Sequence, residues 1–155
     1  MQFETKMKNR GYLCMRINTS HAIHSAMMEP LLERFTGAIG GLSFNKPLIP
    51  YISNVTGEWI TVGEARDPAY WATHLRKTVL FADGIKELID EPGCIFIEIG
   101  PGRDLSTLIQ RYIAGTPHHH AVDLIRVQGR KISDLYYFLD RIGRLWLLGI
   151  KINWP

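Results

Sequence analysis

The sequence has few of the features that mark secreted, membrane or nucleic-acid-binding proteins. Its 155 residues include only two cysteines, Cys14 and Cys94, which lie far apart in apolar runs. We therefore expect buried free thiols instead of a disulfide, which favours a reducing, cytoplasmic compartment. No apolar run approaches the roughly 18 residues of a membrane span, and no basic patch with interleaved aromatic residues indicates a nucleic-acid partner. The remaining class is a cytoplasmic globular protein with a small net charge of +3.

The sequence also lacks an evident nucleophile. No G-x-S-x-G elbow occurs, and the nearest approach, Gly41-Leu42-Ser43-Phe44-Asn45, lacks the second glycine and follows a predicted helix. Neither cysteine lies in an evident electropositive setting that would favour a thiolate. By itself, the chain therefore offers no convincing nucleophile for a base to activate.

What the sequence does contain is an alternation of helical and strand-like segments. Helices are expected over residues 3–9, 27–39, 67–76, 83–89, 104–112 and 132–146, and strands over residues 12–17, 48–55, 94–99 and 121–127, with an extended segment at 150–154. Strands that alternate with helices predict an α/β fold with a largely parallel sheet. Trp71, Trp146 and Trp154 fall in apolar patterns and are expected to be core residues.

Two histidines lie three residues apart in Ser20-His21-Ala22-Ile23-His24-Ser25, between a predicted strand and a predicted helix. A histidine there suits a general base, because its pKa lies near neutrality. A metal ligand is the second interpretation, but no matching set of carboxylates or thiols stands nearby. A loop or capping histidine is the third, and the pattern alone favours it.

Two other motifs permit alternative functions. Residues 96–105 form a strand, a Gly100-Pro101-Gly102 turn and a helix start, which is similar to the first motif of S-adenosylmethionine-dependent methyltransferases, with Asp123 as the acidic residue of the next strand. Only 53 residues follow Gly102, too few for the rest of that fold. A tight strand-to-helix turn is the simpler interpretation. His118-His119-His120 is expected to be a solvated loop in preference to a metal site.

Read together, the segments resemble the acyltransferase domain of type I polyketide synthases and its fatty-acid-synthase relatives. The segments that match in order and spacing are His21-Ala22-Ile23-His24-Ser25, Met28-Glu29-Pro30, Ser53-Asn54-Val55-Thr56-Gly57, Tyr70-Trp71, Leu75-Arg76, Val79, Phe81-Ala82-Asp83-Gly84 and Glu98-Ile99-Gly100-Pro101-Gly102. Residues 135–154 resemble the linker that follows this domain, so the resemblance covers nearly the whole chain.

The resemblance implies a catalytic role for His24. In that family a serine attacks the malonyl thioester of coenzyme A, and the acyl group passes to the phosphopantetheine thiol of an acyl carrier protein. His24 matches the histidine that takes and returns the serine proton, and the backbone carbonyl of His74 matches the group that orients it. The resemblance implies no metal and no resident cofactor.

His21, Ala22 and Ile23 match the segment tied to extender-unit choice, in the form associated with malonyl. A bulky third residue would crowd the α-methyl group of methylmalonyl. Here that residue is Ile23, where the usual malonyl form has phenylalanine. A methylene-sized difference discriminates by about 1–3 kcal/mol, so malonyl is expected to be preferred only moderately.

The family's serine elbow, its carboxylate-binding arginine and its oxyanion glutamine have no match here. We therefore expect a fragment: residues 1–18 ending a ferredoxin-like subdomain, 19–116 forming the C-terminal part of a hydrolase-like subdomain, and 117–155 the linker. Its expected partners are the missing N-terminal half, an adjacent ketosynthase, an acyl carrier protein and malonyl-CoA. A non-catalytic remnant that acts as a docking scaffold is the alternative.

Overall fold

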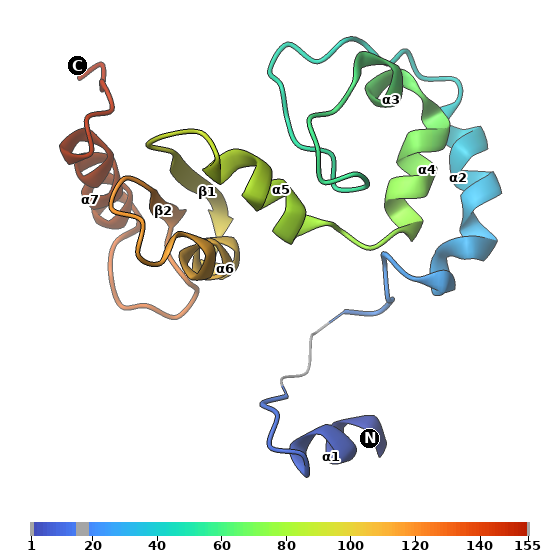
Figure 1. Cartoon of the computed structure of the whole chain (residues 1–155), viewed down its shortest axis with the longest axis horizontal. Coiled ribbons are helices and arrows are strands. Elements are labelled where there is room, and N and C mark those ends of the chain that lie inside the picture. Colours follow the sequence, from blue (N-terminus) through green and yellow to red (C-terminus); the bar gives the residue numbers. More distant parts are fainter. Residues whose placement is uncertain (1, 15–18, 155) are drawn as a thin grey trace. The chain divides into compact units, whose positions relative to one another are not determined.

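The chain folds as two compact units in the computed structural model, which describes residues 2–14 and 19–154 (Figure 1). One unit comprises residues up to 46 together with 63–78. The other comprises residues 47–62 together with 79 to the C-terminal end. No helix among the described residues is long and apolar enough to cross a bilayer.

The first unit is helical. It contains α1 (Gln2–Lys8), the 3-10 helix η1 (Ala26–Leu31), α2 (Leu32–Ile39), most of α3 (Val62–Arg66) and α4 (Pro68–Arg76). The Asp67 side chain accepts the N–H of Ala69, and Pro68 occupies the first turn, so α4 begins where this Asp-Pro pair predicts. Helix α4 packs against both α2 and η1.

The helix expected over residues 27–39 is divided into η1 and α2. Ser25 caps η1 by accepting the N–H of Met27, as a serine before a helix should. Pro30 lies inside η1 and has no N–H to donate, so an α-helical ladder cannot run through this turn. The turns before Leu32 therefore take the tighter 3-10 spacing.

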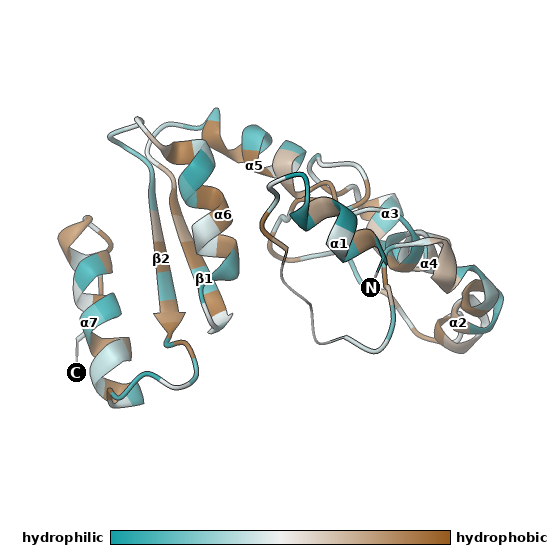
Figure 2. Ribbon diagram, turned by 90° about the horizontal axis from the view of Figure 1, so that it is seen from below, coloured by the Kyte–Doolittle hydropathy of each residue, from teal (hydrophilic) through white to brown (hydrophobic). Residues whose placement is uncertain are grey.

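The second unit contains a two-stranded parallel sheet with helices around it. Its elements are α5 (Phe81–Ile89), β1 (Ile95–Pro101), α6 (Asp104–Ile113), β2 (His120–Ile125) and α7 (Asp134–Leu147). Phe96 pairs with Ala121 and Glu98 with Asp123 in the parallel register. Helix α6 lies along the two strands and α7 flanks β2 (Figure 2). Ile85, Ile109 and Ile113 form the core between α5 and α6, and Phe96 and Ala121 of the sheet pack against it.

Glu98 of β1 caps α6 from the sheet. Its carboxylate accepts hydrogen bonds from the N–H of Leu105 (3.1 Å), and from the N–H (2.8 Å) and hydroxyl (2.6 Å) of Ser106. Burial raises the pKa of the Glu98 carboxyl, but these three bonds outweigh burial and the pKa lies below its usual value. Asp104 is the first residue of α6, and the Arg103 side chain before it makes no cap hydrogen bond.

Other sequence expectations are wrong. Residues 48–55 do not form a buried strand. Leu48 is 98% exposed, and the β pairing of this stretch among the described residues is limited to an isolated antiparallel bridge between Ile52 and Trp59. Pro47 and Pro50 lack the N–H groups that a strand ladder requires. Residues 12–14 are not a strand, and the rest of the segment expected at 12–17 lies outside the described residues.

The expected core tryptophans and buried thiols also need correction. Trp146 is 55% exposed and Trp154 50% exposed, whereas Trp71 is partly buried. Cys14 and Cys94 are free thiols, but both are only partly buried. The segment expected to be extended at 150–154 forms neither helix nor strand within the described chain. The apolar periodicity correctly predicted helix α7, but it did not predict which apolar side chains of α7 are buried in this chain.

We predict that Gly84→Ala destabilises the second unit. A Cβ at Gly84 would lie 2.7 Å from Cγ2 of Ile52, so Ile52 would have to move. The expected net loss in free energy of unfolding is about 1–2 kcal/mol, because overpacking costs about 1–3 kcal/mol and the removal of a helical glycine from α5 returns about 0.5–1 kcal/mol. Urea unfolding measures it, with Gly37→Ala in α2 as the control. A Cβ at Gly37 meets nothing within 4 Å, so this change should stabilise by about 0.5–1 kcal/mol. Equal effects of the two substitutions would contradict the packing assigned to Gly84.

Candidate active site

His24 lies against the C-terminal end of α4, where its main chain and side chain both donate hydrogen bonds. Its N–H donates to the carbonyl of Leu75 (3.0 Å). Its ring Nδ1 lies 2.9 Å from the carbonyl oxygen of His74 and 3.0 Å from that of Lys77. Three backbone carbonyls of one helix end therefore hold one histidine.

The helix end explains why these carbonyls are available. The last carbonyls of an α-helix have no partner within the helix. Helix α4 ends at Arg76, and Lys77 turns into an extended conformation. His24 supplies the donors that the helix lacks. An ion pair between Arg76 and Glu29 (2.6 Å) also links this end of α4 to η1, shortly after His24.

The two carbonyl partners determine the tautomer of His24. A carbonyl oxygen only accepts, so Nδ1 must carry the hydrogen and Nε2 must hold the free lone pair. Within the described residues, Nε2 makes no hydrogen bond. A neutral imidazole with Nε2 unprotonated is a general base ready to accept a proton.

The same helix end would keep its hydrogen bonds to the ring when Nε2 takes up a proton, because the carbonyls stay bonded to Nδ1–H. The C-terminus of a helix also carries partial negative charge. In Ser-His-Asp triads a buried aspartate orients the histidine and stabilises its charge. Here backbone carbonyls occupy that position.

His24 has a strained backbone. Its φ is +60°, the only positive value among the described non-glycine residues. The left-handed conformation costs an ordinary residue about 1–2 kcal/mol. Such outliers concentrate at functional sites, where the surrounding contacts enforce them. The three bonds to α4 are contacts of this kind.

The His74 ring lies against His24 as well. The two ring centroids are 5.3 Å apart in an edge-to-face arrangement, and His74 also contacts the rings of Tyr70 and Trp71. Trp71 is held by a hydrogen bond from its indole N–H to the carbonyl of Ala65 (3.2 Å). Burial lowers the pKa of His74, and the nearby His24 lowers it further. His74 thus offers both a carbonyl and a ring to the site.

The other candidate residues lie on the same loop but are more exposed. His21 is exposed and its Nδ1 lies 2.9 Å from the hydroxyl oxygen of Ser20. The carbonyl of Ala22 accepts a hydrogen bond from the Ser25 hydroxyl (2.6 Å), and Ile23 is 57% exposed. Sequence reasoning missed Lys77, because a carbonyl contribution leaves no side-chain pattern to detect.

The alternative motifs are used in local structure. No group of three or more potential metal ligands occurs among the described residues. Nδ1 of His119 accepts the backbone N–H of Cys94 (3.2 Å). Asp123, the residue offered for a methyltransferase, accepts a hydrogen bond from the buried Tyr137 hydroxyl, and Glu98 caps α6. These side chains stabilise the fold, and nothing about them supports a methyltransferase.

Comparison with known proteins gives a consistent result. No protein-family model matches the chain. The phenolphthiocerol synthesis polyketide synthase type I Pks15/1 of Mycobacterium marinum is 33% identical over 147 residues, which are 94% of this chain and 7% of that protein. The crystal structure of the acyl transferase domain of SpnD, in complex with 2-(pent-4-yn-1-yl)malonyl, matches with a TM-score of 0.88 at 35% identity, over 96% of this chain and 36% of that chain. In sequence and fold, the chain matches a part of the acyltransferase domain of polyketide synthases.

A second acyltransferase domain gives the same match. The structure of the ZmaA domain has a TM-score of 0.84 at 38% identity, over 99% of this chain and 35% of that chain. The chain therefore spans about a third of these acyltransferase domains and only 7% of the Mycobacterium marinum synthase. This confirms the resemblance to a C-terminal part of the acyltransferase domain and the α/β class.

We predict that His74 makes the stability of the chain depend on pH. Its pKa is lower in the folded chain than in the unfolded chain, where it is about 6.5. The unfolded state therefore binds more protons, and stability falls as the pH drops below about 6.5. His74→Phe keeps an aromatic ring but cannot be protonated, so it should lose less stability between about pH 7.5 and about pH 5. Urea unfolding across that range measures the difference.

The control for this prediction is His118→Gln, because His118 is exposed on a loop of the second unit. Its stability curve should run parallel to that of the wild-type chain. If the His74→Phe curve also runs parallel to the wild type, the proton linkage assigned to His74 is wrong.

Proposed function

We propose that this chain supplies the general base, His24, of a polyketide synthase acyltransferase site whose nucleophilic serine lies outside this chain. The observation that carries the proposal is the pair of carbonyl contacts to Nδ1, which leaves Nε2 unprotonated. A capping or loop histidine would need neither two carbonyl partners on its ring nor a left-handed backbone. The family relationship supplies the reaction in which such a base would act.

In the proposed reaction, Nε2 of His24 takes the proton from the serine hydroxyl as the serine oxygen attacks the thioester carbonyl. The carbon–sulfur bond then breaks, and His24 returns the proton to the departing thiol of coenzyme A. In the second half-reaction, Nε2 takes the proton of a phosphopantetheine thiol on a carrier protein. The sulfur of that thiol attacks the carbonyl of the acyl-serine. The serine oxygen leaves and regains the proton. A positioned base of this kind contributes about 10²- to 10⁴-fold in rate.

The proposed acyl group is malonyl. His21, Ala22 and Ile23 precede the base directly, so they would lie beside the substrate in a complete site. The branched Ile23 side chain would crowd a substituent on the α-carbon. The related SpnD domain was crystallised with a substituted malonyl group, so the fold itself accommodates larger substituents. We therefore propose a moderate preference for malonyl.

Exposed apolar surface supports a missing half as the first partner. Ile99 of β1 is 78% exposed and Ile97 is 41% exposed, on a strand that is paired on one side only within the described chain. An unpaired parallel strand edge with apolar side chains favours a further strand. The proposed organisation keeps residues 1–18, 19–116 and 117–155 as successive parts of one acyltransferase and its linker, with a ketosynthase and a carrier protein as neighbours in the synthase.

The test is acyl transfer by the reassembled domain. The chain is mixed with an N-terminal half that bears the serine, then incubated with malonyl-CoA, and intact mass is recorded. We expect malonyl mass on the serine half only when both parts are present, and a rate about 10²- to 10⁴-fold lower with His24→Ala.

His24→Asn is the matched control. Asparagine tolerates a positive φ and can donate its amide to the same carbonyls, but it cannot act as a base. It should preserve the complex of the two halves and still lower the acylation rate by about 10²- to 10⁴-fold. A stable complex in which His24→Asn acylates at the wild-type rate would contradict the proposal. If the two halves form a stable complex but neither the wild-type chain nor a variant supports acylation, the alternative of a non-catalytic docking scaffold would be favoured.

A further inference from the structure

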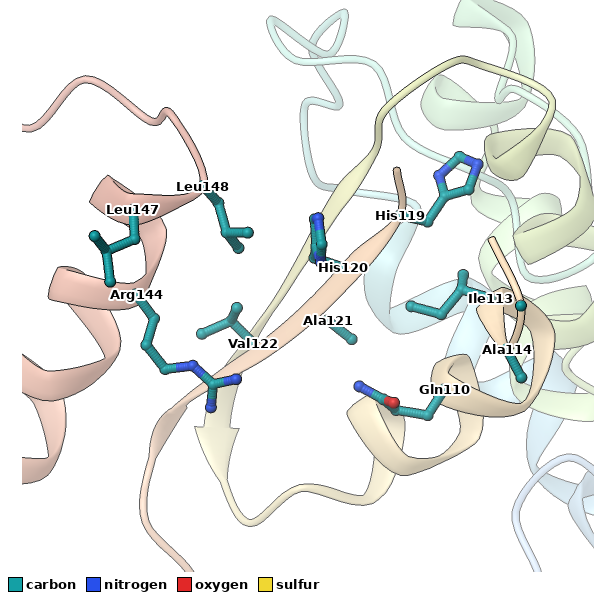
Figure 3. Close-up of a pocket in the computed structure, with 11 residues that line it drawn as sticks. Gln110, Ile113, Ala114, His119, His120, Ala121, Val122, Arg144, Leu147 and Leu148 are labelled. Carbon is teal, nitrogen blue, oxygen red and sulfur yellow. The ribbon is translucent and has the colours of Figure 1, made fainter. Parts of the chain in front are cut away.

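A cleft in the second unit lies between α6, β2 and α7 (Figure 3). Its volume is about 500 Å³. The walls are largely apolar, with Val122 of β2, Leu147 at the end of α7 and its C-cap Leu148 among the lining residues. Arg144 of α7 and Gln110 of α6 extend toward the strand from opposite sides (Figure 3). The proposed acyl-transfer reaction uses none of these side chains.

A second hollow of about 410 Å³ continues this cleft. The two share Gln110, Ala121 and Arg144 as lining residues. The second hollow adds Arg103 and Arg141, so it is lined by three arginines. Together the hollows form one groove, called here the α6/α7 groove, that is apolar at one end and cationic at the other.

The positive charge in the cationic end is only partly balanced. Asp123 is the single carboxylate that lines this hollow, and it already accepts the hydroxyl hydrogen of Tyr137. Arg141 has one distant ion pair, to Asp140 at 3.6 Å. Across the residues that the structure describes, the guanidinium groups of Arg103 and Arg144 form no ion pair or hydrogen bond. The hollow therefore has an excess of cationic donors.

Arg141 is held in place before any ligand binds. Its side chain is 15% exposed, and its guanidinium carbon lies 4.6 Å from the centroid of the Tyr137 ring. Its Nε is buried and has no hydrogen-bond partner among the described residues. The Nε therefore cannot be reached from the hollow, and the contact that Arg141 offers to an oxyanion comes from the rest of its guanidinium group, which the Tyr137 ring holds in place.

We propose that the α6/α7 groove binds a phosphate monoester of a slim apolar alcohol. A phosphate group suits the excess of three arginines over two carboxylates, Asp123 in the hollow and Asp140 beside Arg141. Guanidinium groups bind phosphate through paired N–H donors. The apolar part of the ligand would lie against Val122, Leu147 and Leu148. This site does not depend on His24 or on the proposed acyl transfer, so either proposal can fail without the other.

The test is a titration of the chain with n-butyl phosphate, followed by backbone amide chemical shifts. Shifts are expected in α6, β2 and α7. Inorganic phosphate, which lacks the apolar part, and pentanoate, which carries one charge, should both bind more weakly. Arg144→Gln should weaken binding of butyl phosphate by about tenfold, as the loss of one charge-assisted contact predicts.

Arg111→Gln is the matched control, because Arg111 is exposed on α6 and does not line either hollow. It removes the same charge and should leave binding nearly unchanged. Because Arg144 is exposed on α7, its replacement should preserve the fold. Amide chemical shifts of the ligand-free variant that match those of the wild-type chain away from position 144 would verify this. Absence of binding at millimolar butyl phosphate would overturn the proposal. An equal loss in Arg111→Gln and Arg144→Gln would also overturn it, because it would indicate attraction by net charge alone.

Discussion

The candidate site depends on one contact, between the carbonyls at the end of α4 and the two N–H donors of His24. Every helix leaves its last carbonyls unpaired, and here the loop that carries His24 bonds to them. The contact orients the ring, determines which nitrogen carries the hydrogen and enforces a backbone conformation that histidine rarely adopts. Without it, His24 would be one more polar residue on an exposed loop.

The sequence predicted those elements whose local chemistry agrees with their tertiary setting. Asp67 and Pro68 begin α4 because a cap and a first-turn proline act within a few residues. The apolar periodicity of α7 gave its existence and approximate bounds. The strand predicted at 48–55 was wrong, because apolar content alone does not make a strand where Pro47 and Pro50 lack the backbone N–H groups that strand pairing needs. The division of the 27–39 helix at Pro30 has the same cause.

The site was predictable only in part. The resemblance pointed to His24 and to the carbonyl of His74, and the structure brings these two groups within hydrogen-bond distance. The carbonyl of Lys77 and the ring of His74 were not anticipated, because backbone acceptors and ring packing leave no residue pattern in one sequence. Asp123 shows the reverse case: the sequence permits it as the acidic residue of a methyltransferase motif, yet it accepts a hydrogen bond from Tyr137. Glu98, beside the glycine turn of that motif, caps α6.

The most direct test of the central claim is the tautomer of His24, measured by long-range ¹H–¹⁵N correlation of the imidazole nitrogens near neutral pH. The His24 signals are assigned by their loss in His24→Asn. The account predicts a protonated Nδ1 and an unprotonated Nε2, since two carbonyls accept from Nδ1. A hydrogen on Nε2 of the neutral ring, or an even mixture of the two tautomers, would contradict it, because the ring would then not be held by the end of α4.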